Sequence, residues 1–161
     1  MEIKKVKLSK ENLKIIKSID EIFYKDDRLT LQWYLERYNE NHDGILLINE
    51  ENINVGYLVC VPIKEELYNQ FVTGMLSDDV EVDPQMFIKE SKYNYIVSTV
   101  IFENYRRKGY GTKMLEELMK DSDGKNYCAI SVSSEGYKLL KKKLDVTKKV
   151  NDTVYAFEKK C

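Results

Sequence analysis

Two glycines and three basic residues lie within seven positions of this sequence, in the segment Arg106-Arg107-Lys108-Gly109-Tyr110-Gly111-Thr112. Glycine lets the backbone approach a ligand closely because no Cβ stands in the way. If a helix begins in this segment, its first backbone N–H groups are unpaired and carry partial positive charge. Together with the basic side chains, they predict a binding site for a pyrophosphate group. A basic, glycine-containing surface turn is the alternative.

The elements on either side of this loop favour the phosphate site. A β-rich run at Tyr93–Phe102 predicts a central strand, and an amphipathic pattern predicts a helix at Lys113–Lys120. Two other phosphate motifs fit less well. A Walker loop needs four residues between its glycines, and a dinucleotide fingerprint needs a third glycine where Met114 stands.

The rest of the chain alternates between patterns typical of strands and of helices, which predicts a mixed α/β sheet with helices on its faces. An insert at 63–92 carries helical spacing at Leu67, Tyr68, Phe71 and Met75, followed by an acidic loop. The expected strands are 2–8, 45–48, 55–61, 127–132 and 153–157, and the expected helices are one capped by Ser9, 29–38, and 135–144 capped by Ser134.

The composition of the chain argues against nucleic-acid-binding, membrane and metal-binding proteins. The 161 residues, with a net charge of −1, predict one domain over 1–161, with no affinity for nucleic acid or for a membrane. The lysine-rich stretch 138–149 is then a solvated helix face. One histidine, His42 in a polar loop, and three cysteines without CxxC spacing do not suffice for a metal site. The N-terminus lacks an apolar signal sequence, so the cytoplasm is the expected location.

The segment from Val100 to Gly111 resembles the central motif of the GNAT superfamily of N-acetyltransferases. That motif is Gln/Arg-x-x-Gly-x-Gly/Ala after a sheet strand, and Arg106, Gly109 and Gly111 match it, with Tyr105 as the preceding aromatic residue. The resemblance implies a mostly antiparallel sheet of about six or seven strands, splayed at its central strand, with about four helices on its faces.

The resemblance also implies acetyl-CoA as the co-substrate, with no metal. The backbone of Arg106–Thr112 would wrap the CoA pyrophosphate, while Ile101 and Phe102 would offer backbone groups to the pantetheine arm. The splay would leave a backbone N–H for the thioester oxygen, and catalysis would come mainly from juxtaposing amine and thioester.

The second GNAT motif, Asn-x-x-Ala-x-x-x-Tyr-x-x-x-Gly-Phe, is only partly present. Ser134 stands at its Asn position, where it would join the CoA site, Tyr137 at its Ala position and Lys141 at its Tyr position. The usual general acid is therefore absent. Tyr137 or Lys141 could reach the sulfur instead, or they could be a core aromatic residue and a solvated charge. Glu103 is the candidate general base, with an exposed loop carboxylate as the alternative.

These observations predict an N-acetyltransferase that acts through a ternary complex of acetyl-CoA and a primary amine on a small molecule or peptide. A non-catalytic acyl-CoA-binding regulatory or interaction module is the alternative, and a homodimer is possible. The acidic loop Asp78–Asp83 and the connection Tyr24–Thr30 are the expected wall of the acceptor site.

Overall fold

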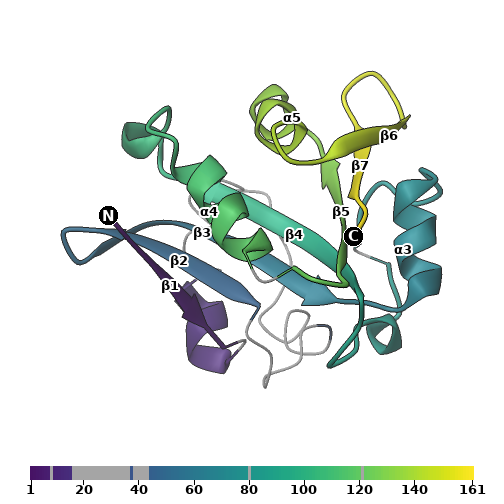
Figure 1. The fold of residues 1–161 in the computed structure, drawn as a ribbon, viewed down its shortest axis with the longest axis horizontal. Helices are drawn as coiled ribbons and strands as arrows, with labels where there is room; N and C mark the ends of the chain where they lie inside the picture. Colours follow the sequence, from purple (N-terminus) through teal and green to yellow (C-terminus); the bar gives the residue numbers. More distant parts are fainter. Residues whose placement is uncertain (8, 16–36, 38–43, 80, 121) are drawn as a thin grey trace.

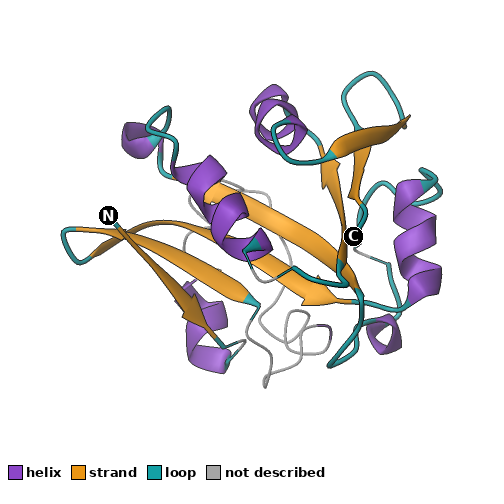
Figure 2. Ribbon diagram, viewed as in Figure 1, coloured by secondary structure: helices purple, strands orange, loops and turns teal. Residues whose placement is uncertain are grey.

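A seven-stranded sheet in the order β1-β2-β3-β4-β5-β7-β6 forms the centre of the fold (Figures 1 and 2). The computed structural model describes the whole chain except residues 8, 16–36, 38–43, 80 and 121. Only β4 and β5 are parallel, and the other neighbouring strands are antiparallel, which confirms the mixed α/β fold. The strands are β1 Glu2–Val6, β2 Ile45–Glu50, β3 Ile53–Pro62, β4 Tyr93–Ile101, β5 Asn126–Ser131, β6 Asp145–Lys149 and β7 Tyr155–Lys159.

Helices cover both faces of this sheet. Helices α4 (Tyr110–Met119) and α5 (Ser134–Lys141) share one face, where their buried residues form a cluster with Leu58, Ile96 and Phe157. Helix α3 (Glu65–Val72) lies on the opposite face, in a second cluster that includes the tyrosines of β3 and β4. Figure 1 shows α4 crossing β3 and β4, with α3 beside β5 and β7. Two short 3-10 helices, η1 (Pro84–Met86) and η2 (Glu103–Tyr105), lie before and after β4.

The described N-terminal residues include the predicted strand, which ends at Val6 rather than at residue 8, and the start of the predicted helix. The backbone N–H of Asn12 donates to Oγ of Ser9 at 3.1 Å, which confirms Ser9 as a helix cap. Residues 10–15 are helical. Apart from Arg37, the expected helix at 29–38 lies outside the described residues, as do the Tyr24–Thr30 connection and His42.

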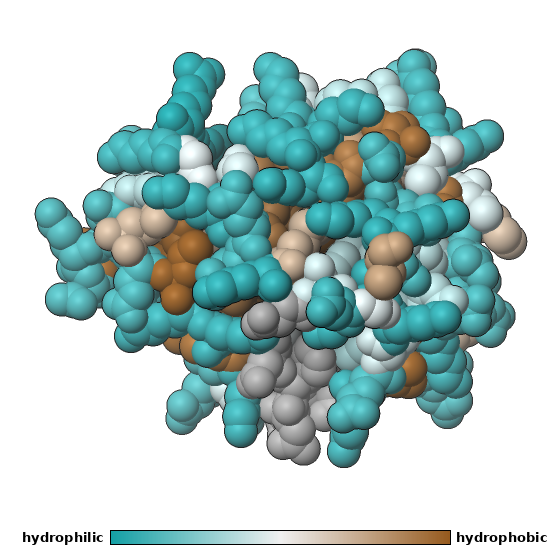
Figure 3. Space-filling model, viewed as in Figure 1, coloured by the Kyte–Doolittle hydropathy of each residue, from teal (hydrophilic) through white to brown (hydrophobic). Residues whose placement is uncertain are grey.

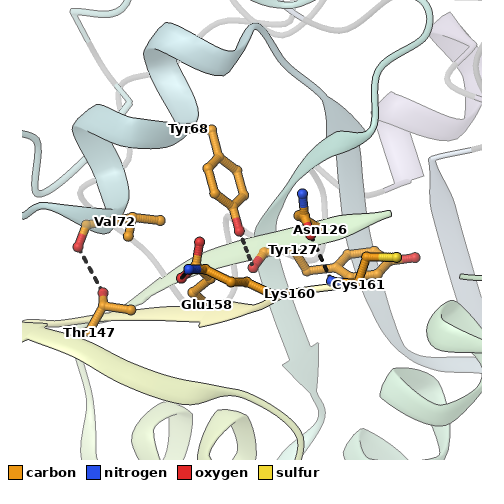
Figure 4. Close-up of polar contacts among 8 residues, drawn as sticks. All are labelled: Tyr68, Val72, Asn126, Tyr127, Thr147, Glu158, Lys160 and Cys161. Atoms are coloured by element: carbon orange, nitrogen blue, oxygen red, sulfur yellow. Dashed lines mark hydrogen bonds and ion pairs between the residues drawn. The ribbon is translucent and has the colours of Figure 1, made fainter. Parts of the chain in front are cut away.

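Two hydrogen bonds join helix α3 to the C-terminal half of the sheet (Figure 4). The Tyr68 hydroxyl donates to the Tyr127 carbonyl of β5 at 3.2 Å, and the Thr147 hydroxyl of β6 donates to the Val72 carbonyl at 2.8 Å. Tyr68 is buried, as the spacing predicts. Met75 departs from the prediction, because the helix ends before it and its side chain is 74% exposed.

The C-terminal elements differ from the prediction in two ways. Ser133, not Ser134, caps α5, because its Oγ accepts from the Gly136 N–H at 3.1 Å. The helix ends at Lys141 instead of Leu144, and the chain then forms β6, a strand that the sequence pattern did not predict. Four of the five residues of β6 are exposed, so the strand lacks the alternation that marks a half-buried strand.

Hydrophilic side chains cover most of the face drawn in Figure 3. In the described part of the chain, the large hydrophobic side chains that are exposed come from scattered positions: Met1, Ile53, Met75 and Val132. Exposed apolar residues scattered singly in this way are common on protein surfaces. Among the described residues, no helix combines the length and the apolar character needed to cross a bilayer.

Candidate functional site

The start of α4 presents backbone N–H groups that have no partner within the helix. Gly109 is the N-cap, in the left-handed conformation at φ 78°, and no side chain caps the helix. The N–H of Lys113 donates to the Gly109 carbonyl at 3.0 Å, so the amides of residues 110–112 precede this first helical bond. Such amides, at the positive end of the helix dipole, attract an anion. The helix begins three residues before the predicted start at Lys113, which brings Gly111 into its first turn.

The basic side chains of the preceding loop take different positions. Arg106 folds back, because its Nε donates to the Ile101 carbonyl at the end of β4 at 2.9 Å. The Nζ of Lys108 lies 5.3 Å from the centre of the Tyr105 ring. Arg107 is exposed and has a φ of 64°, a conformation uncommon for a residue with a side chain. The loop therefore places three positive charges beside the start of α4.

Helix α5 contacts the first turn of α4. A Cβ added at Gly111 would lie 2.9 Å from Cδ1 of Leu139, so any larger residue there requires the Leu139 side chain to move. The Nζ of Lys142 donates to the Thr112 hydroxyl at 3.1 Å. Sequence analysis missed Lys142 as a neighbour of this loop, because the pattern around it indicated only a solvated helix face. The contact adds a fourth basic residue next to the start of α4.

Strands β4 and β5 part from one another halfway along their length. Their pairing covers Tyr93–Ile96 and Asn126–Ala129, after which β4 continues beside β3 to Ile101 and β5 continues beside β7 to Ser131. Figure 1 shows the two strands diverging from this point. The splay begins at a β-bulge, because Val59 pairs with Ser98 and the next residue of β3 pairs with Ile96. The extra residue is Val97. This confirms the predicted splay of the central strand.

The backbone of Ile101 faces the side of β4 that β5 has left. The N–H of Phe102 donates to the Val55 carbonyl of β3 at 2.9 Å, and alternate residues of a strand point their backbone groups in opposite directions. The Phe102 carbonyl accepts from the N–H of Tyr105 at 2.9 Å. Both backbone groups of Phe102 are thus engaged within the protein, and of the two predicted residues only Ile101 has its backbone directed away from β3.

Tyr137 and Ser134 both line a cleft of about 400 Å³ beside the N-terminal half of α5. The Tyr137 ring packs edge-on against Tyr155 and Phe157 of β7, with ring centres 4.8 and 5.5 Å away. The ring is partly exposed, so it is at once a packing residue and a wall of the cleft. Sequence analysis missed Asp152, Thr153 and Tyr155 as part of this wall, because the predicted strand at 153–157 gave no sign that it would lie beside α5.

Lys141 and Glu103 do not line this cleft. Lys141 is the last residue of α5, one turn beyond Tyr137, and its side chain is exposed. Glu103 is the first residue of η2, just after β4, and is also exposed. The structure therefore brings Tyr137 and Ser134 together, while Glu103 lies at the end of β4 near the loop that precedes α4.

The acidic part of the insert has identified neighbours at two points. The side chain of Asp83 caps η1 by accepting from the N–H of Gln85 at 2.9 Å. Burial raises the pKa of Tyr95 well above its usual range, and the charges of Asp79 and Asp78 nearby raise it further. Asp79 and Asp78 thus lie close to a core tyrosine.

Solved structures with this fold include several acetyltransferases. An N-acetyltransferase from Staphylococcus aureus Mu50 is 15% identical, with a TM-score of 0.62 and coverage of 99% of this chain and 100% of that chain. The loading GNATL domain of CurA from Lyngbya majuscula is 11% identical, with a TM-score of 0.72 and coverage of 99% and 98%. Arabidopsis thaliana Naa50 in complex with the bisubstrate analogue CoA-Ac-MVNAL is 15% identical, with a TM-score of 0.65 and coverage of 99% and 98%.

At sequence identities this low, the structural similarity shows a shared fold alone. No curated protein sequence matches the chain. The sequence profile described as "Acetyltransferase (GNAT) family" matches residues 12–136, well over half of the 161 residues. The matched range contains the splayed strand β4, the basic loop and the start of α4 described above. The chain therefore belongs to the acetyltransferase (GNAT) family.

Proposed function

We propose that this protein transfers an acetyl group from acetyl-CoA to a primary amine, in a ternary complex of both substrates. The observation that carries the proposal is the uncapped start of α4, which follows a loop of three basic residues and stands next to the splay of β4 from β5. Membership of the family supports the transferase activity. Solved neighbours bound to acetyl-CoA or to a peptide bisubstrate analogue support the choice of substrates.

In this proposal, the backbone amides between Arg106 and Thr112 hold the pyrophosphate of CoA. The charges of Arg107 and Lys108 add attraction, and Lys142 stands close enough to contribute. The pantetheine arm then runs along β4, where the backbone of Ile101 faces the splay. Phe102 contributes its side chain rather than its backbone, because both of its backbone groups are already bonded.

The reaction needs no covalent intermediate on the protein. The amine nitrogen attacks the thioester carbonyl, the C–N bond forms, the C–S bond breaks, and the thiolate of CoA takes up a proton. Burial raises the pKa of the Cys60 and Cys128 thiols, so neither is present as a thiolate nucleophile at neutral pH. Cys161 is exposed beyond the end of β7. Positioning of the two substrates is then the main source of rate enhancement.

Tyr137 is the proposed proton donor to the thiolate, and Lys141 is the alternative. Tyr137 lines a cleft next to the end of β5 and is partly exposed there, whereas Lys141 is outside this cleft. Glu103 is the proposed base that takes the proton of an incoming ammonium group, directly or through water. Its place just after β4, before the basic loop, supports this role.

A second candidate is an acyl-CoA-binding module without catalytic activity. The observation that favours it is the packing of Tyr137 against Tyr155 and Phe157, which restricts how far the ring can move toward a bound thioester. The same fold could then bind acetyl-CoA as a signal.

One experiment separates the two candidates. Calorimetry measures acetyl-CoA binding, and release of free thiol from acetyl-CoA is followed with a panel of amines that includes polyamines, amino acids and peptides with free N-termini. We expect binding and amine-dependent thiol release. The variant Tyr137→Phe should lower kcat by roughly 100-fold or more while leaving the Kd of acetyl-CoA unchanged, and Lys120→Met, at the exposed end of α4, should match the wild type.

Other outcomes have definite meanings. Binding without thiol release for any amine would favour the non-catalytic module. If the variant Lys141→Met loses activity and Tyr137→Phe does not, Lys141 is the proton donor. Absence of acetyl-CoA binding at millimolar concentration would overturn both candidates.

A further inference from the structure

Two buried hydroxyl groups near the splay have no hydrogen-bond partner among the described residues. They are Oγ1 of Thr99 in β4 and Oγ of Ser131 at the end of β5. Ser131 is 2% exposed. Buried polar groups in folded proteins are nearly always bonded, so an unbonded pair calls for a physical explanation. A ligand that supplies the missing partners is one such explanation.

Both hydroxyls point to the face that carries α4 and α5. Ser98 and Val100, the neighbours of Thr99, face the α3 side, where the Ser98 hydroxyl donates to the Tyr57 hydroxyl at 2.9 Å. Thr99 must therefore face the α4 side, as does Leu58, its pairing partner in β3. A Cβ on Gly136 of α5 would lie 3.7 Å from Cβ of Ser131, which places the Ser131 side chain beneath α5.

The two residues also stand opposite one another across the splay. The last pair of β4 and β5 is Ile96 with Ala129. Two residues further along β5 is Ser131. Three residues further along β4 is Thr99, because the bulge at Val97 adds one residue to that strand. The hydroxyls therefore flank the point where the two strands have just separated.

This position lies on the path from the basic loop into the splay. Ile101, whose carbonyl accepts from Arg106, is two residues from Thr99, a distance of roughly 7 Å along a strand. A molecule held at the start of α4 and extending back along β4 would meet Thr99 and Ser131 after it passes Ile101. The two hydroxyls lie on the same face as α4, whose start is proposed to hold the pyrophosphate.

We infer that Thr99 and Ser131 form hydrogen bonds with the amide groups of the pantetheine arm of the acyl donor. This inference rests on the proposed function. Pantetheine has two amides between its phosphate end and its sulfur, and each brings a donor and an acceptor. A hydroxyl can both donate and accept, so it fits either partner. An arm entering a buried channel needs such partners, since an unbonded buried amide is costly. Thr99 and Ser131 are thus positioning residues for the acyl-pantetheine part of the donor.

The test uses two probes, acetyl-CoA and acetylpantetheine, which lacks the nucleotide and pyrophosphate. The variants Thr99→Val and Ser131→Ala should each raise the Kd of both probes by about threefold to tenfold. In contrast, Arg107→Ala should weaken acetyl-CoA and leave acetylpantetheine unchanged. Because the two hydroxyls are unbonded in the free protein, their removal should not lower the Tm of the ligand-free chain.

Ser98→Ala is the matched control. Its hydroxyl lies on the same strand but is bonded to Tyr57 on the other face. We therefore expect this variant to lower the Tm and to leave both Kd values unchanged. If Thr99→Val and Ser131→Ala behave like this control, the hydroxyls are bonded within the protein and the inference fails while the proposed function stands. The inference would also fail if Thr99→Val and Ser131→Ala changed neither the Kd values nor the Tm. If the wild type binds neither probe, the proposed function fails as well.

Discussion

The Tyr110 hydroxyl donates a hydrogen bond to Oε2 of Glu50, joining the first residue of α4 to the last residue of β2. This bond lowers the pKa of the Glu50 carboxyl, and the same bond raises the pKa of Tyr110. The contact is made at the first turn of α4, whose free amides are proposed to hold the pyrophosphate. Glu50 thus anchors the start of the helix to the sheet.

Removing this bond should change both the titration of Glu50 and ligand affinity. A lowered carboxyl pKa contributes stability at pH values above the unfolded pKa, and this stability is lost as the pH falls through the folded pKa. In Tyr110→Phe, we expect the Glu50 pKa to rise toward 4.5, as measured by NMR titration of the carboxyl carbon. The acetyl-CoA Kd should rise by less than about tenfold. Tyr105→Phe is the control, and an unchanged Glu50 pKa in Tyr110→Phe would contradict the assignment.

Arg107 offers a way to separate charge from backbone strain. Its φ of 64° suits glycine, so Arg107→Gly should be more stable than Arg107→Ala by about 1 kcal/mol. Both variants lose the same charge, and both should weaken acetyl-CoA binding, with a smaller dependence of Kd on salt than the wild type. Chemical denaturation and calorimetry measure the two effects. Equal stabilities of the two variants would show that the left-handed conformation is not kept in solution.

The contact between Gly111 and Leu139 should couple the two helices energetically. The variant Gly111→Ala forces the end of the Leu139 side chain to move, and this cost opposes the gain of about 1 kcal/mol that alanine brings to a helix. Adding Leu139→Ala should remove that extra cost, giving a non-zero coupling energy in a double-mutant cycle. Gly109→Ala is the control, because no atom lies within 4 Å of the added Cβ and its cost comes from a φ of 78° alone. Additive effects at Gly111 and Leu139 would contradict the contact.

The three cysteines should differ sharply in reactivity. Burial raises the pKa of Cys60 to about 12 and that of Cys128 well above its usual range, whereas Cys161 is exposed. Thiol reagents attack the thiolate, so at pH 8 only Cys161 should react rapidly with a chromogenic disulfide. All three should react in denaturant. Because the folded pKa of Cys60 is raised, its burial stabilises the protein below the unfolded pKa, and this contribution is lost as the pH rises toward 12. Rapid reaction persisting in Cys161→Ser would disprove this expectation.

The sequence was most informative where a local pattern determines the structure. The Ser9 cap, the β4 strand and the glycine-rich start of α4 all depend on residues close together in the chain. The strand β6 could not be predicted, because its residues are mostly exposed and gain their order from pairing with β7. The cap at Ser133 instead of Ser134 is a choice between adjacent serines that only the position of the helix decides.

The parts of the site that the sequence did not reveal come from contacts between distant segments. Lys142 reaches Thr112 across two helices, and Asp152 reaches the Tyr137 cleft through the β6–β7 connection. Neither contact produces a periodic pattern in the sequence. The partnerless hydroxyls of Thr99 and Ser131 also escape pattern analysis, because serine and threonine are unremarkable in strands until the bulge at Val97 is known.

The bulge at Val97 decides which face each later residue of β4 occupies. Tyr95 and Val100 lie on the same face although they are five residues apart, which strict alternation would forbid. Deleting Val97 would remove the bulge and put Tyr95 and Val100 four residues apart, so strict alternation would then keep Thr99 on the α4 side and Val100 on the α3 side. A replacement such as Val97→Ala leaves the count intact. A deletion scan of β4 should therefore find that removal of Val97 preserves the faces of the later residues, whereas a second deletion in the strand would turn them over.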